Sequence, residues 1–181
     1  MKNIVLLLTI LSLSMITSCK DDDDLNPNDP DSKFGEISFK ADGQEIRFSS
    51  GKASFWSLFA GSEILSLSGA TTDAKVIRID FTILGDTTLQ DFNYNFSHNC
   101  GNLGTERICG FLTYNEDVLQ ISQELYFSSE VPDGNLNIEI SSIDYRSGGH
   151  IAGTFSGTVF SAAANNDSRT ISDGKFNLKI D

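Results

Sequence analysis

The chain has 181 residues, with 25 acidic against 13 basic residues and a formal net charge of −12. The length allows one domain with its own core, and a hydrophobic fraction of 39% with 13 phenylalanines excludes wholesale disorder. The excess of acid argues against nucleic acid as a partner, because binding phosphates requires clustered Lys and Arg.

The first eighteen residues are predicted to be a signal peptide. A positive start at Lys2 is followed by an almost wholly apolar run over Ile4–Ile16. Thirteen helical residues span about 20 Å, which is short of a bilayer core of about 30 Å. A run of this length after a positive start is typical of a secretory signal, residues 1–18, and not of a membrane span.

The residues that follow point to a lipid anchor. Ile16-Thr17-Ser18-Cys19 resembles the bacterial lipobox, in which small residues precede an invariant cysteine that is diacylated and becomes the mature N-terminus. The resemblance implies lipidation of Cys19 and attachment to a membrane. An ordinary secretory signal with an incidental cysteine is the alternative.

The four aspartates after Lys20 are similar to the start of Bacteroidota outer-membrane lipoproteins. That resemblance implies an outer-membrane lipoprotein exposed at the cell surface, with a periplasm-facing lipoprotein as the alternative. Residues 19–33 hold two of the three prolines and are predicted to be a flexible acidic tether. A single domain is expected over residues 34–181. Because only six of the acidic residues lie in the tether, acidity is a general property of the domain surface.

Alternation of apolar and polar residues dominates the domain and predicts β-strands. Ile77–Ile83 alternates strictly, and Asp42-Gly43 between two alternating runs predicts a hairpin. About ten short strands separated by turns predict an antiparallel β-sandwich, with a closed or partly open β-barrel as the alternative. Further strands are expected at Ala53–Phe59, Ile64–Ser68, Phe111–Tyr114, Val118–Phe127, Ile138–Ile143, Ile151–Phe160 and Phe176–Ile180.

Two cysteines remain once Cys19 carries lipid. Cys100 and Cys109 form an even pair in an exported protein, which predicts a disulfide between them. A redox or nucleophilic cysteine paired with His98 is the alternative. A metal site built from these three residues lacks a fourth ligand with suitable spacing, so neither a metal nor a cofactor is expected.

No catalytic motif is complete, and a non-enzymatic protein is therefore expected. The chain contains no H-E-x-x-H, no G-K-[ST] loop and no G-x-S-x-G. Gly153-Thr154-Phe155-Ser156-Gly157 has its serine in the fourth place, within an alternating strand. Gly153 and Gly157 are expected where another sheet or a large aromatic side chain approaches the backbone. A hydrolase is the remaining enzymatic alternative.

Aromatic residues supply the candidate ligand contacts. Phe55 and Trp56 must point to opposite faces of an extended strand, so one of them is a candidate for exposure. Tyr94 and Phe96 share a face, with asparagines on the other. An exposed Trp56 together with Tyr94 would suit a sugar ring, whereas the alternative places Trp56 in the core.

The C-terminal third carries a family resemblance. His150–Thr158, followed after a polar loop by Thr170–Leu178, resembles a pattern of small Bacteroidota outer-membrane lipoproteins of an uncharacterised all-β family, and Phe39–Gly43 fits as its opening hairpin. The resemblance implies an all-β fold and transfers no catalytic residue. Gly174 is expected to supply a turn.

These observations lead to a functional expectation. The chain is expected to be a non-enzymatic binding or interaction module at the cell surface, with a glycan or a protein as its ligand. The alternative is a structural or assembly accessory of an outer-membrane complex.

Overall fold

The described part of the chain is built almost entirely of β-strands. In the computed structural model, eleven strands and one short 3-10 helix are described, which confirms the predicted all-β fold. Among these residues, no helix has the length and apolar character of a membrane span. The predicted signal peptide and tether lie outside the described residues, as do Cys19, His98 and Cys100. The described ranges are 34–57, 61–85, 87–90, 92–97, 108–120, 123–163 and 166–181.

The strands follow one another through short connections. In chain order they are β1 (Glu36–Ala41), β2 (Gln44–Phe48), β3 (Lys52–Ser57), β4 (Glu63–Ala70), β5 (Val76–Ile83), β6 (Asn93–Ser97), β7 (Ile108–Asn115), β8 (Tyr126–Ser128), β9 (Asn135–Ile143), β10 (His150–Ser161) and β11 (Ser168–Lys179). The 3-10 helix η3 (Gln123–Leu125) precedes β8. The predicted hairpin is confirmed, since Asp42 (φ 49°) and Gly43 (φ 84°) form the turn between β1 and β2.

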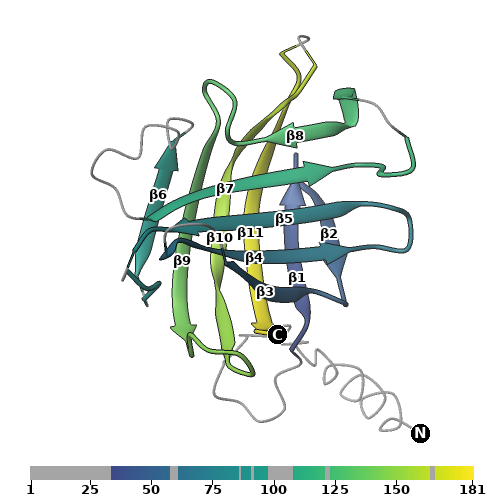
Figure 1. Ribbon diagram of the computed structural model, residues 1–181. Coiled ribbons are helices and arrows are strands. Elements are labelled where there is room, and N and C mark those ends of the chain that lie inside the picture. Colours follow the sequence, from purple (N-terminus) through teal and green to yellow (C-terminus); the bar gives the residue numbers. More distant parts are fainter. Residues whose placement is uncertain are drawn as a thin grey trace, which may run out of the picture.

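All strands belong to one antiparallel sheet that curls into a half-barrel. The order is β2-β1-β11-β10-β8-β7-β5-β4-β3, with β9 added to β10 and β6 added to β9. In Figure 1, β3, β4, β5 and β7 run across β1, β9, β10 and β11. We call β2-β1-β11-β10-β9-β6 the six-strand wall and β3-β4-β5-β7-β8 the five-strand wall.

The two walls also contact each other between β3 and the C-terminus. Ala53 on β3 forms an isolated parallel bridge with Ile180, and the N–H of Asp181 donates to the Ala53 carbonyl at 2.9 Å. The Tyr145 hydroxyl donates to Glu63 Oε2 at 3.2 Å, and burial of this phenol raises the pKa of Tyr145. These contacts join the β9–β10 connection and the C-terminus to the five-strand wall.

Apolar side chains of both walls fill the space between them. On β5, Ile77, Ile79, Phe81 and Ile83 are buried, whereas Arg78 is exposed, as the alternation predicts. Burying each such side chain stabilises the fold by roughly 1.5–3 kcal/mol. The outer face of each wall is left to the intervening polar residues.

Gly153 lies beneath an aromatic ring, as expected. A Cβ on this glycine would approach Phe176 Cζ to 2.8 Å and would also collide with the Glu139 carbonyl. The ring centroids of Phe155 and Phe176 lie 6.3 Å apart in the core. The glycine of the C-terminal pattern therefore serves packing.

The turn predicted at Gly174 is wrong. Gly174 lies inside β11, which pairs with β10 on both sides of it, through Ile171 and Phe176. Asp173 adopts φ 52°, and the pairing register with β10 shifts between Phe155 and Gly157. The Asp-Gly pair thus forms a β-bulge, because the flanking residues already have strand partners.

The strand predicted over Val118–Phe127 is also largely wrong, since β8 begins only at Tyr126. The N–H of Asp117 donates to Asn115 Oδ1 at 3.0 Å, and the N–H of Leu119 donates to Asp117 Oδ1 at 2.9 Å. These side-chain bonds bend the chain away from the sheet and leave Leu119 82% exposed.

Candidate functional site

A groove of about 1190 Å³ crosses the outer face of the six-strand wall. Every strand of this wall contributes to it, so the groove extends across all six strands. Its lining comprises Glu36, Ser38, Lys40, Glu45, Arg47, Asn93, Tyr94, Asn95, Asn137, Ile138, Glu139, Thr154, Phe155, Ser156, Ser172, Asp173, Gly174 and Lys175.

The strand register arranges the polar lining in two rows that run perpendicular to the strands. Neighbouring strands are about 4.8 Å apart, so six strands make a floor about 24 Å across. The first row, from β6 to β2, is Asn93, Glu139, Thr154, Lys175, Ser38 and Arg47. The second row is Asn95, Asn137, Ser156, then across the bulge Ser172, Lys40 and Glu45.

Charged side chains in the β11, β1 and β2 part of the groove pair with one another. Lys40 Nζ donates to Asp173 Oδ2 at 2.8 Å, and Arg47 Nε donates to Glu45 Oε1 at 2.6 Å. The hydrogen bond and charge of Lys40 lower the pKa of Asp173, and the same contact raises the pKa of Lys40. These ions already use part of their bonding capacity on each other.

The β6, β9 and β10 part of the groove is different, because its Asn, Glu, Thr and Ser side chains hydrogen-bond to no described residue. These side chains stand on three adjacent strands and most of them are exposed. We call this set the amide cluster. It comprises Asn93, Asn95, Asn137, Glu139, Thr154 and Ser156.

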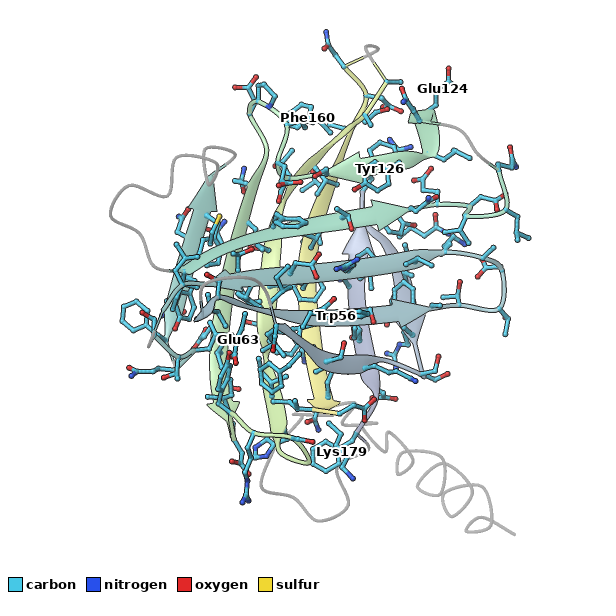
Figure 2. All side chains as sticks on the ribbon, viewed as in Figure 1. Trp56, Glu63, Glu124, Tyr126, Phe160 and Lys179 are labelled. Atoms are coloured by element: carbon cyan, nitrogen blue, oxygen red, sulfur yellow. The ribbon has the colours of Figure 1, made fainter. Side chains whose placement is uncertain are left out.

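Trp56 is exposed, which confirms that Phe55 and Trp56 face opposite sides and is contrary to the core alternative. Its side chain is 60% exposed on the outer face of the five-strand wall, where Figure 2 labels it. Phe55 turns inward, 4.8 Å from the Tyr145 ring between centroids. Trp56 is not part of the groove lining.

Tyr94 borders the groove, but its ring turns toward the core. It stacks on Phe96 with ring centroids 5.7 Å apart and an interplanar angle of 10°, which confirms their shared face. The Tyr94 hydroxyl accepts from the N–H of Gln90 at 3.1 Å. Trp56 and Tyr94 therefore lie in different walls, and the structure does not bring the two predicted ligand contacts together.

The groups weighed for chemistry are spread over the described part of the chain. Cys109 is buried in β7, whereas Cys100 and His98 lie outside the described residues, so both the disulfide and the redox alternative stay predictions. Ser142 Oγ and His150 Nε2 lie 2.9 Å apart, and no described carboxylate hydrogen-bonds this imidazole. In the described ranges, no three His, Cys, Asp or Glu residues gather into a metal site.

The amide cluster was not predicted from the sequence. The available signal was the alternation of Asn93 and Asn95 with aromatic residues on β6, and of Asn137 and Glu139 with isoleucines on β9. Alternation predicts that these side chains face away from the core. Alternation does not predict that β6 pairs with β9, or that β9 pairs with β10.

Searches against protein-family models, curated proteins and solved structures found no match to this chain. The resemblance to Bacteroidota outer-membrane lipoproteins stays a prediction. A functional proposal for the chain therefore depends on its own residues and their arrangement.

Proposed function

We propose that the protein is a non-enzymatic binding module, anchored to the outer membrane by lipid on Cys19 and facing the cell surface, that holds its ligand in the groove of the six-strand wall. The observation that carries the proposal is the amide cluster, whose exposed side chains hydrogen-bond to no described residue. Polar groups converging on a concave surface are what orients a ligand.

Trp56 lies outside the proposed ligand site. Its side chain is 60% exposed, and a single exposed aromatic side chain is ordinary on a protein surface. The groove and Trp56 lie on opposite walls, so the groove alone is proposed as the ligand site.

Blocking the groove tests the proposal. Ser156→Trp fills the floor on β10, and Ser54→Trp on β3 is the matched control, because both serines are half-buried on the outer faces of strands. The full chain is screened against immobilised oligosaccharides and a library of extended peptides. Wild type and Ser54→Trp should retain the same ligands, and Ser156→Trp should lose them. Binding unaffected by Ser156→Trp, or no ligand for wild type in either set, would overturn the proposal.

Fractionation tests the anchor. Cys19→Ala should release the protein from the membrane fraction, since the acyl chains supply the membrane affinity. Continued membrane attachment of Cys19→Ala would contradict lipidation at this residue. Digestion of intact cells with protease should degrade the wild-type domain if it faces outward, and protection would favour the periplasm-facing alternative.

A further inference from the structure

The amide cluster forms a two-by-three grid on three paired strands. Asn95 lies opposite Asn137, which lies opposite Ser156, and Asn93 lies opposite Glu139, which lies opposite Thr154. Cross-strand neighbours on one face are about 4.5–5.5 Å apart at Cβ. Adjacent members can therefore bind neighbouring groups of one ligand at the same time.

We infer that the ligand of this groove is a neutral carbohydrate chain that lies across the strands, with its hydroxyl groups bonded by the amide cluster. The inference rests on the proposed function, because it names the ligand class of the same groove. Its first support is chemical. Each Asn side chain offers two donors and one acceptor, Glu139 only accepts, and the Ser and Thr hydroxyls do both. A ligand that matches this mixture must donate and accept at closely spaced positions, as the neighbouring hydroxyls of a sugar do.

The length and direction of the floor provide the second support. Polar side chains continue in two rows across all six strands, over about 24 Å, so a chain of repeating hydroxylated units meets similar groups along its whole length. A small polar metabolite would leave most of this surface unused. Affinity should therefore rise with the number of sugar units.

A peptide fits the floor less well. Extended peptides gain main-chain hydrogen bonds by adding to a sheet edge, whereas β9, β10, β11 and β1 are each paired on both sides. The apolar residues of these strands are turned inward, with Ile138 2% and Phe155 3% exposed. The middle of the groove therefore offers neither free main-chain groups nor apolar pockets for peptide side chains.

Charge favours a neutral chain over a polyanion. Lys40 and Arg47 are already paired with Asp173 and Glu45. Glu36 and Glu139 bring the lining to four carboxylates against three basic side chains, the third being Lys175. The whole chain carries −12, so a polyuronate meets repulsion that extends over about 10 Å at moderate salt.

Calorimetric titration of the full chain tests the inference. The probes are neutral linear oligosaccharides of glucose, mannose, xylose and galactose, from disaccharide to hexasaccharide, with a galacturonate hexasaccharide and a polar extended peptide. We expect at least one neutral series to bind, with affinity rising with length. Asn95→Ala combined with Asn137→Ala should weaken it by about tenfold or more, because several ligand hydroxyls lose their partners. The control Ser54→Ala, on the five-strand wall, should bind as wild type.

Tighter binding of the galacturonate or the peptide than of every neutral series would overturn the inference, as would an unchanged affinity for the double alanine variant. The Ser156→Trp variant distinguishes a failure of the carbohydrate inference from a failure of the proposed function. A peptide or polyanion that binds wild type but not Ser156→Trp contradicts the carbohydrate inference and leaves the groove as the binding site. If no probe binds in a manner sensitive to Ser156→Trp, the inference and the proposed function both fail.

Discussion

The side chain of Asn177 gives the sharpest prediction about stability. This residue of β11 lies between Glu36 and Ala152 on the neighbouring strands and is 0% exposed. Neither its amide nitrogen nor its carbonyl oxygen has a hydrogen-bond partner among the described residues. Leucine has the same branching of heavy atoms as asparagine. We therefore expect Asn177→Leu to stabilise the protein.

The expected magnitude follows from the penalty for an unpaired buried amide. Burying such a group without a partner costs about 1–3 kcal/mol, so removing it should raise the free energy of unfolding by a similar amount. For a domain of this size, each kcal/mol corresponds to about 2–4 °C in Tm. Urea unfolding followed by far-UV circular dichroism gives the free energy directly, provided the slope with urea is unchanged.

Two further variants test whether loss of the unpaired buried amide causes the gain in stability. Asn177→Ala removes the amide but leaves a cavity, so it should be less stable than Asn177→Leu. Asn137→Leu, at an exposed position of β9, should stay within about 0.5 kcal/mol of wild type. A loss of 1 kcal/mol or more in Asn177→Leu would refute the reasoning, because it would mean that the native amide has a favourable partner.

Three other predictions concern packing, an ion-pair cluster and the cysteines. The Arg169 guanidinium donates to both carboxylate oxygens of Glu116, which follows β7, at 2.7 and 3.2 Å, and lies 4.3 Å from the Phe127 ring centroid. Arg169→Met should therefore lower the free energy of unfolding by about 1–3 kcal/mol. The exposed Arg146→Met should change it by less than about 0.5 kcal/mol, and equal effects in urea unfolding would contradict this. Gly153→Ala should cost about 1–3 kcal/mol or more, because its Cβ collides with a neighbouring carbonyl; a wild-type Tm would count against it. Peptide mapping without reductant should find Cys100 linked to Cys109, which stabilises by about 2–3 kcal/mol, and a free thiol on either would sink that pairing.

Much of the fold could be predicted because alternation is a local signal. Ile77, Ile79, Phe81 and Ile83 follow one another at a spacing of two, and the structure buries all four. The two wrong predictions, the strand over Val118–Phe127 and the turn at Gly174, have different physical causes. At Asp117 and Asp173, the decisive interactions are a side-chain bond to a nearby backbone N–H and a bulge imposed by strands distant in the sequence.

The candidate site could be predicted only in its parts. Asn95, Asn137 and Ser156 each occupy an outward position that alternation predicts, but they lie 42 and 19 positions apart in the chain. Their proximity depends on two strand pairings, β6 with β9 and β9 with β10. The two aromatic residues that the sequence offered as candidate ligand contacts, Trp56 and Tyr94, are divided between the two walls for the same reason.

The sequence by itself determined that this is an acidic, all-β domain, which side of most strands faces the core, and that either Phe55 or Trp56 would be exposed. These properties depend on charge count and on a two-residue period, which any extended chain expresses locally. Only the tertiary structure decided which outward faces became neighbours, and so where the groove lies. Cross-strand register depends on contacts between residues far apart in the chain, and it brings the amide cluster together on the six-strand wall.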